Sequence, residues 1–363
     1  MIKITDTLEP GSLKKGVLIT DIHFGKKSNS PLHNQDCLDF IDWVCETVKE
    51  SGDIDYVAFL GDWHENRSSL NVFTLDFSYK GAQKLNELGI PVYFVIGNHD
   101  LGLRHSREIY STISFNAFEN FVVVDGEPHV ADEIEGGCVF MPFLLHDEYE
   151  NLAEYSTIPV WMGHFEFKGF VLTGQNHVMD RGPSIDAFKP MKRIFSGHFH
   201  KRQSQKNTHY IGNAFPMDFS DANDFDRGLA IYDHTSDTLE YRNWDVCPKY
   251  IRGKLSEVMD GEIDLLPNSY VQLEADFQIT YEEVTKLKPA LIEANGLRGL
   301  DIDEKTKFTE ALEGDEQDLD EIERDEDGNL KSSNELIIDM LRANEVETFD
   351  STMLIDIFEG LKS

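Results

Sequence analysis

Five short motifs in the first 200 residues carry side chains that bind metal ions, and most of them follow an apolar run. In chain order they are Asp21-Ile22-His23, Gly61-Asp62, Gly97-Asn98-His99-Asp100, Gly163-His164 and Gly197-His198-Phe199-His200. A glycine beside the ligand lets the backbone turn tightly and keeps side-chain bulk away. Any one of these motifs is common by chance, but five in order at the ends of apolar runs indicate one assembled site.

The mixture of ligand types favours a centre of two divalent transition metals. Imidazole together with carboxylate suits manganese, iron or zinc, whereas sites made of oxygen alone suit magnesium and calcium. Two neighbouring ions need a bridging carboxylate and several further protein groups, and such centres hydrolyse phosphoesters. The predicted metal ligands are Asp21, His23, Asp62, Asn98, His164, His198 and His200.

The elements that position these residues are predicted from the spacing of apolar side chains. The runs at 17–20, 56–60 and 92–96 are typical of buried strands, and the segments 35–50 and 72–88 have the apolar spacing of helices. This alternation predicts a partly parallel sheet, whose loops at the carboxyl ends of the strands are available for chemistry.

From about 121 to 242 the expected strands come closer together and helix is scarcer, so we expect a second sheet packed against the first. Its strands would include 121–124, 228–233 and 238–243. The predicted fold class is α/β, a two-sheet β-sandwich flanked by helices, with a small α+β capping domain and C-terminal helices. The predicted domains are a catalytic domain at 1–244, the capping domain at 245–300, an acidic linker at 301–331 and a helical partner-docking segment at 332–363.

The charge of the chain argues against strong nucleic-acid binding by the protein alone. The net charge is −34, from 67 acidic and 33 basic residues. The stretch 301–330 holds fourteen acidic and three basic residues, and the rest of the chain still carries about −23. Because contacts to phosphate dominate affinity for DNA, a phosphoesterase this acidic would need a basic partner to bind DNA strongly.

The cysteines and the N-terminus bear on location. The four cysteines are scattered without a C-x-x-C motif, and Cys37 and Cys45 have the spacing of core residues on a helix. The N-terminus lacks the features of a signal peptide, and no apolar run is long enough to span a membrane. We therefore expect a reduced, cytoplasmic protein, located in the host cytoplasm if the source is a phage.

The ordered motifs resemble those of the calcineurin-like metallophosphoesterase superfamily, which read D-x-H, GD, GNH, GH and GHxH, over roughly residues 17–240. The resemblance implies that Asp21, His23 and His200 hold one metal and that Asn98, His164 and His198 hold the other. Asp62 would bridge the two ions. It also implies that His99 acts as general acid or transition-state stabiliser and that Asp100 orients it.

A finer resemblance is to the SbcD-like nuclease subunits of double-strand-break repair, especially their bacteriophage members. It rests on GHFEFKGF at 163–170, on SGHFH followed by HYIGNAFPMDF at 196–219, and on FDRGLAIYD at 225–233. It implies a manganese-dependent exonuclease (3′-to-5′ on duplex ends) and single-strand endonuclease that acts on DNA in recombination and repair. It also implies an SbcC-like coiled-coil ATPase partner bound through the C-terminal helices. A homodimer formed by the helices at 35–50 and 72–88 is implied as well, with burial of these helices within one protomer as the alternative.

The second motif departs from that pattern, because it reads GDWHENR. Relatives usually have an apolar pair and then Asp or His three places beyond the ligand, where Glu65 stands here. His64, Arg67 and Arg104 are candidate DNA-binding residues, with an exposed loop histidine and surface arginines as the alternatives. Trp63 would stack on a base or pack under its loop.

Three alternatives stay open at this point. A small-molecule phosphatase or cyclic-nucleotide phosphodiesterase would use the same metal core, and a non-catalytic scaffold would keep only the fold. The terminal helix carrying Met353, Leu354, Ile357, Phe358 and Leu361 either docks on a partner or folds back on the catalytic domain.

Overall fold

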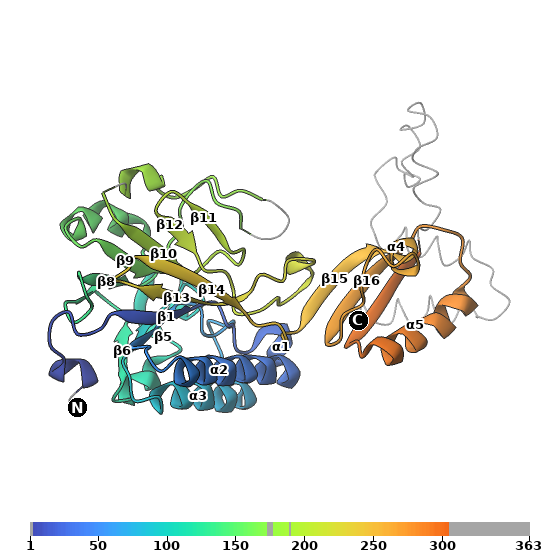
Figure 1. Ribbon diagram of the computed structural model, residues 1–363, viewed down its shortest axis with the longest axis horizontal. Coiled ribbons are helices and arrows are strands. Elements are labelled where there is room, and N and C mark those ends of the chain that lie inside the picture. The colour runs from blue at the N-terminus through green and yellow to red at the C-terminus, as the bar shows by residue number, and fades with distance from the viewer. Residues whose placement is uncertain (1–2, 173–176, 189, 305–363) are drawn as a thin grey trace, which may run out of the picture. The chain divides into compact units, whose positions relative to one another are not determined.

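The computed structural model describes residues 3–172, 177–188 and 190–304. Two six-stranded sheets dominate this part of the chain, and both mix parallel and antiparallel pairs (Figure 1). The α/β class and the two-sheet architecture predicted from the sequence are therefore confirmed. The predicted linker beyond residue 304 and the helical segment at 332–363 lie outside the described residues.

The first sheet has the strand order β14-β13-β1-β2-β3-β6. Strands β1, β2, β3 and β6 run parallel, and β13 and β14 are antiparallel additions at the β1 edge. The bounds are β1 (Lys15–Ile19), β2 (Tyr56–Leu60), β3 (Val92–Val95), β6 (Phe121–Val124), β13 (Gly228–Asp233) and β14 (Thr238–Asn243).

The second sheet has the order β11-β12-β10-β9-β8-β7, with a parallel centre and an antiparallel strand at each edge. Its bounds are β7 (His129–Ala131), β8 (Cys138–Met141), β9 (Val160–Gly163), β10 (Arg193–Ser196), β11 (Gln203–Gln205) and β12 (Thr208–Tyr210). The expectation that 121–124, 228–233 and 238–243 belong to this sheet was wrong. These segments pair with β3 and β1 of the first sheet, because proximity along the chain does not set strand order.

Alternate residues of the first sheet face two different cores. Val17, Ile19 and Phe59 pack against the helices, while Leu18 and Leu60 pack between the two sheets. Because a strand buried on both faces needs apolar side chains at every position, β1 and β2 read as continuous hydrophobic runs.

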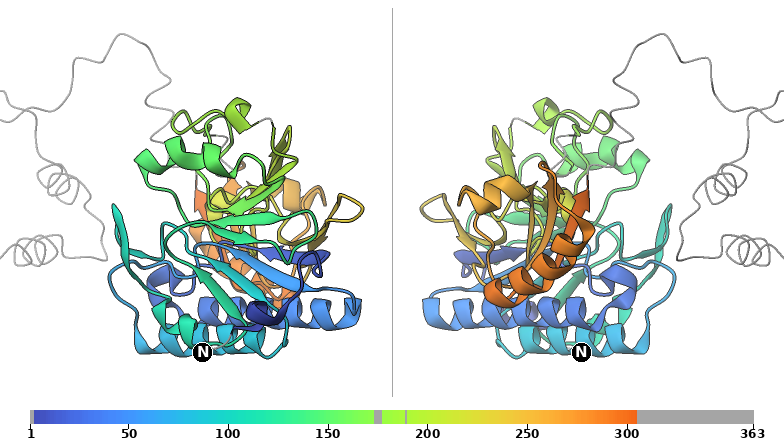
Figure 2. Two further views of the ribbon diagram at one scale, coloured as in Figure 1. Left: turned by 90° about the vertical axis from the view of Figure 1, so that its left-hand side faces the viewer. Right: turned by 90° about the vertical axis from the view of Figure 1, so that its right-hand side faces the viewer.

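Helices α2 (Pro31–Ser51) and α3 (Val72–Asn86) lie side by side along the outer face of the first sheet (Figures 1 and 2). The Ser30 side chain accepts a hydrogen bond from the His33 amide at the start of α2, and Asn71 caps α3 in the same way. Cys37 and Cys45 are buried on α2, as their spacing predicted. A short helical segment, α1 (Lys26–Asn29), precedes α2, and the hairpin β4 (Leu101–Leu103) and β5 (Ser106–Tyr110) follows the GNHD motif.

The segment after Trp244 forms a small parallel sheet of three strands with two helices. The elements are β15 (Lys249–Lys254), α4 (Leu255–Met259), β16 (Ser269–Ala275), α5 (Tyr281–Asn295) and β17 (Gly299–Glu304). The last strand crosses the boundary that we had placed at residue 300. The Arg298 guanidinium forms two hydrogen bonds of 2.6 Å with the Asp36 carboxylate on α2, which fastens this unit to the helical layer.

None of the described helices is long and apolar enough to cross a bilayer.

Candidate metal centre

The five motifs lie at the carboxyl ends of five strands: β1, β2 and β3 of the first sheet and β9 and β10 of the second. Parallel strands present these ends at one edge of a sheet, and the two sheets face each other across a shared core. The fold therefore gathers residues that are as far apart in the chain as Asp21 and His200.

The first two motif loops are held to each other by backbone hydrogen bonds. The amides of Asp21, Ile22 and His23 donate to the carbonyls of Gly61 and Asp62, at 3.0–3.2 Å. Beyond them the Phe24 amide donates to the Trp63 carbonyl at 2.8 Å, and the Glu65 amide donates to the Phe24 carbonyl at 3.0 Å. The parallel pairing of β1 and β2 thus continues into the site and fixes the separation of Asp21 and Asp62.

Four of the predicted ligands have left-handed backbone conformations. The φ angles are 49° for Asp21, 53° for His23, 61° for Asp62 and 86° for His198. Residues other than glycine rarely adopt this region, and such strain concentrates at functional sites. Sequence patterns gave no sign of it.

Two glycines of the motifs are required by close packing around the ligands. A Cβ on Gly97 would lie 2.2 Å from Asp62 Oδ1, and one on Gly61 would lie 2.3 Å from His164 Nδ1. Gly61 also has φ of 101°. The motif glycines are therefore part of the construction of the site, as the sequence predicted.

The first candidate metal position is formed by Asp21, His23 and His200, whose ligand atoms lie within 4.8 Å of one another. Asp21 Oδ1 is 3.8 Å from His23 Nε2 and 3.9 Å from His200 Nε2. The Asp21 carboxylate is held in turn by the Thr20 hydroxyl at 2.5 Å and by the His198 amide at 3.0 Å.

The second candidate position is formed by Asp62, His164 and His198, with Asn98 among them. The Asn98 side-chain oxygen is 3.0 Å from His164 Nε2 and 2.9 Å from His198 Nδ1, and Asp62 Oδ2 is 3.3 Å from His164 Nε2. Asp62 Oδ2 also lies 3.9 Å from His23 Nε2 of the first position. Asp62 thus stands between the two positions, where a bridging carboxylate belongs.

The donor set fits two divalent ions. The nitrogen His164 Nδ1 donates to the Leu60 carbonyl at 2.7 Å, which leaves Nε2 with a lone pair directed at Asp62 and Asn98. His23 Nε2 is buried and has no hydrogen-bond partner among the described residues, although two carboxylates lie within 3.9 Å of it. Buried polar atoms without such partners, next to carboxylates, are typical of a site that binds a cation.

The charges of the metal-free site show the same need for a cation. Burial disfavours a charged imidazole, but Asp21, Glu65 and Asp62 outweigh it and raise the pKa of His23 to about 10. Burial likewise opposes the effect of Asp62 at His164, whose pKa rises to about 9. In each case the neighbouring carboxylates favour a positive charge at the imidazole.

His99 lies beside the centre, with its ring centroid 5.0 Å from that of His23. Its amide donates to Asp62 Oδ1 at 2.7 Å, and its Nδ1 is 2.9 Å from the Glu65 carbonyl, to which it can donate. The predicted role of Asp100 as the group that orients His99 was wrong on this geometry. The Asp100 carboxylate is buried and accepts from the amides of Asp62, Trp63, His64 and Gly97. It holds the second and third motif loops together.

His64 is not a DNA-binding residue in this structure. Its side chain is buried between the Ser78 and Ser111 hydroxyls, each 2.7 Å from a ring nitrogen, and burial lowers its pKa to about 3. Trp63 is also fully buried and donates to Ser78 Oγ at 2.9 Å, so it packs under the loop. Arg67 is half-buried in the loop before α3, and Arg104 is exposed in the turn of the β4–β5 hairpin. Both arginines remain candidates for phosphate contacts.

Two carboxylates next to ligand histidines were not assigned a role from the sequence. Glu65 Oε2 lies 2.8 Å from His23 Nδ1, and Glu166 Oε2 lies 3.4 Å from His198 Nε2. The position of Glu65, three residues beyond Asp62, was noticeable as a departure from the motif. Glu166 follows His164 by two residues and carries no comparable signal.

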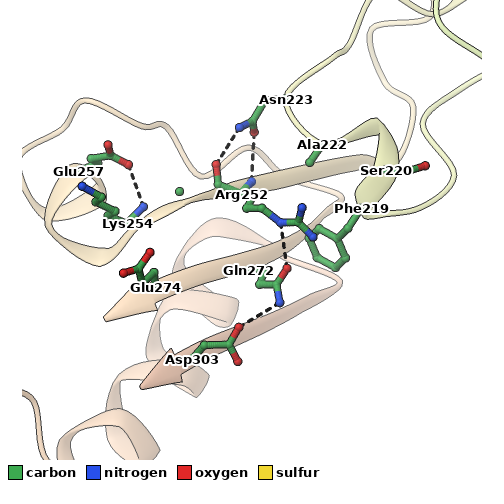
Figure 3. A pocket seen from close by; sticks show the side chains of 11 residues that line it. Phe219, Ser220, Ala222, Asn223, Arg252, Lys254, Glu257, Gln272, Glu274 and Asp303 are labelled. Atoms are coloured by element: carbon green, nitrogen blue, oxygen red, sulfur yellow. Dashed lines mark hydrogen bonds between the residues drawn. The ribbon is translucent and has the colours of Figure 1, made fainter. Parts of the chain in front are cut away.

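A separate hollow of about 710 Å³ lies between the loop 219–223 and the small sheet (Figure 3). On its wall the Arg252 guanidinium lies over the Phe219 ring and donates to Gln272, which donates to Asp303. Arg252 and Lys254 are accompanied there by three carboxylates, Glu257, Glu274 and Asp303. This mixed lining contains none of the predicted metal ligands, so the hollow is distinct from the metal centre.

Comparisons with known proteins give one family and one distant relative. The model of the calcineurin-like phosphoesterase family matches residues 15–202. Exonuclease subunit 1 of enterobacteria phage T4 is 26% identical over 226 residues, which are 61% of this chain and 65% of the phage protein. The match therefore spans less than two thirds of the length of that relative.

Among the solved structures that resemble the chain are two with low identity. An archaeal phosphodiesterase has a TM-score of 0.34 and 10% identity, over 63% of this chain and 99% of its own. A dimetal phosphatase from Danio rerio has a TM-score of 0.37 and 9% identity, over 65% and 96% respectively.

Proposed function

Because the chain belongs to the calcineurin-like phosphoesterase family, we propose that it is the nuclease subunit of a DNA-processing complex, which hydrolyses phosphodiesters at DNA ends. The hydrolase chemistry follows from the family and from the paired clusters of histidine and aspartate. The choice of DNA as substrate is supported by the similarity to exonuclease subunit 1 of phage T4. The identity of the metal is part of the proposal, and manganese suits the mixed nitrogen and oxygen ligands.

In this proposal each group of the site has a task. One ion would be held by Asp21, His23 and His200, and the other by Asn98, His164 and His198. Asp62 would bind both ions. When bound, two divalent ions supply an activated water and neutralise the charge that develops on the phosphoryl oxygens.

The proposed acid is His99. Its Nδ1 faces the Glu65 carbonyl, so a protonated ring directs Nε2–H outward toward a leaving oxygen. Since its amide is anchored to Asp62 Oδ1, the ring stays at a fixed place relative to the metal ligands.

The acidity of the chain supports a basic partner. A net charge of −34 repels duplex DNA, and contacts to phosphate need cations. The proposed partner is an SbcC-like ATPase that supplies this surface and binds the segment 332–363, which lies outside the described residues. Arg67 and Arg104 remain the proposed phosphate contacts of this chain near the motifs.

A homodimer through the helical layer is also part of the proposal. Helix α3 presents four exposed apolar side chains: Val72, Phe73, Leu75 and Tyr79. An apolar stripe of this kind on a helix is typical of a surface that a second helix covers. Sedimentation of wild type against Phe73→Glu tests it, since a charge in such an interface dissociates a dimer, whereas unchanged sedimentation would rule it out.

One assay tests the proposed function against its nearest alternative. The purified chain, with and without its cognate ATPase, is given manganese and offered end-labelled duplex, cyclic nucleotides and nitrophenyl phosphate esters. We expect cleavage of DNA that the ATPase stimulates and that His99→Ala abolishes. Preferential turnover of cyclic nucleotides or phosphate monoesters would instead identify a small-molecule phosphoesterase, and absence of manganese-dependent turnover on every substrate would identify a scaffold.

A further inference from the structure

Glu65 contacts a predicted metal ligand with its side chain and the proposed acid with its main-chain carbonyl. Its side-chain Oε2 lies 2.8 Å from Nδ1 of the metal ligand His23. Its main-chain carbonyl lies 2.9 Å from Nδ1 of His99, the proposed acid. The two histidines belong to different motifs, and their rings meet edge to face at 5.0 Å.

The surroundings hold Glu65 in this place. Its amide donates to the Phe24 carbonyl, one residue beyond His23, so its backbone is fixed to the first motif loop. Its other carboxylate oxygen, Oε1, lies 3.7 Å from Lys26 Nζ, and Lys26 Nζ lies 3.4 Å from Asp218. Oε2 and His23 Nδ1 are both buried and face each other, and neither has another hydrogen-bond partner among the described residues.

This arrangement determines which nitrogen of His23 is available to a metal. A carboxylate at Nδ1 draws the ring proton to that nitrogen and leaves the lone pair on Nε2. Nε2 is the nitrogen that faces Asp21 Oδ1 at 3.8 Å and Asp62 Oδ2 at 3.9 Å. The carbonyl of Glu65 acts similarly on His99. It accepts a hydrogen bond from Nδ1–H, so the proton stays on Nδ1 and Nε2 is directed away from Glu65.

We propose that Glu65 is a dual positioning residue, whose carboxylate orients His23 toward the metal and whose carbonyl orients His99 toward the leaving group. This proposal rests on the metal centre of the proposed function and does not require DNA as the substrate. Only the side-chain arm can be removed by substitution, since every variant keeps its carbonyl.

Metal binding is the readout that separates this role from a general contribution to folding. Manganese alone is titrated into the full-length, metal-free protein by calorimetry, for wild type, Glu65→Gln and Glu65→Ala. Loss of a residue that hydrogen-bonds to a metal ligand typically weakens metal binding about 10–100-fold. We expect a loss in this range for Glu65→Ala and a smaller one for Glu65→Gln, whose amide oxygen still accepts from Nδ1–H. Glu87→Gln, a change of the same type at an exposed position of the helical layer, should bind as wild type does.

Turnover gives the second readout. With bis(p-nitrophenyl) phosphate as substrate, the Glu65 variants should need more manganese for half-maximal rate and approach the wild-type rate at saturation. Manganese affinity equal to wild type in both variants would overturn the proposal, as would a rate loss that no manganese concentration restores. If Glu65→Ala fails to fold by circular dichroism, Glu65→Gln decides alone. If the protein cleaves no DNA while the shift in manganese affinity is present, the proposed substrate fails and the role of Glu65 stands.

Discussion

The carboxylate of Asp100 accepts a hydrogen bond of 3.1 Å from the amide of Asp62, which lies 38 residues earlier in the chain. It also accepts from the amides of Trp63, His64 and Gly97, so one buried side chain fastens the second motif loop to the third. Burial and the negative charge of Asp62 raise the pKa of Asp100 to about 6, against the opposing effect of these amides. Asp62, the proposed bridging ligand, is therefore held through its own amide by the Asp100 carboxylate.

Replacing Asp100 with Asn should destabilise the fold and loosen the metal centre together. An amide has one acceptor oxygen, so several of the four N–H donors lose a partner, at a cost of roughly 2–4 kcal/mol. We expect a lower denaturant midpoint in urea and weaker manganese binding. Asp132→Asn, at an exposed position, is the matched control. A stable variant with normal manganese affinity would show that Asp100 does not hold the loops.

Gly97 should tolerate no side chain. The Cβ of an alanine would lie 2.2 Å from Asp62 Oδ1 and 2.3 Å from the Asp62 amide nitrogen, so the ligand loop has to move. A misplacement of about 1 Å in a catalytic site can lower the rate about 100-fold. We expect at least this loss for Gly97→Ala in manganese-dependent phosphodiester hydrolysis.

The matched control is Gly126→Ala, where an added Cβ meets no atom within 4 Å. It should keep wild-type activity and unfold at the wild-type midpoint. Equal activity of both alanine variants would mean that the loop carrying Asp62 adapts without affecting the chemistry.

His234 lies well away from the metal centre and should make the free energy of unfolding depend on pH. It is buried, and its Nε2 lies 2.7 Å from the Tyr56 hydroxyl. Burial, assisted by the positive charge of Lys192, lowers its pKa from 6.5 to about 4. Between these values the unfolded chain binds the proton and the folded one does not, so stability falls as the pH drops from about 6.5 toward 4, by up to about 3 kcal/mol from this group.

Urea unfolding of the metal-free protein at a series of pH values checks this, with His234→Gln as the comparison. The variant lacks the titrating group, so its stability should fall less steeply over the same range. Equal slopes for the two proteins would show that His234 does not hold its neutral form in the fold.

The sequence predicted the central elements and the ligands because their signals are local. The run YVAFL matches β2 (Tyr56–Leu60) residue for residue, since a parallel strand buried on both faces leaves a continuous apolar pattern. The motifs could be located because most of them follow such a run. The structure then brought together all seven predicted ligands.

What the sequence could not predict depends on contacts between distant segments. His64 appeared to be a loop residue, yet its ring is enclosed by Ser78 and Ser111, and no pattern near residue 64 indicates these partners. Strand β13 joins β1 across more than 200 residues, so its sheet is decided by tertiary pairing and not by its neighbours in the chain. The family resemblance paired Asp100 with the His99 ring, whereas its carboxylate accepts hydrogen bonds from backbone amides of the second and third motif loops.

If His99 is the acid, the activity lost on replacing it should depend on the leaving group of the substrate. DNA releases an alkoxide that needs a proton, whereas bis(p-nitrophenyl) phosphate releases a stabilised nitrophenolate that leaves without one. His99→Gln should therefore cleave DNA about 10²–10⁴-fold more slowly while losing much less activity on the nitrophenyl ester. Manganese binding should be unchanged, because the variant keeps the amide that donates to Asp62 Oδ1. An equal loss on both substrates would assign His99 to stabilising charge on the phosphoryl group and not to protonating the leaving oxygen.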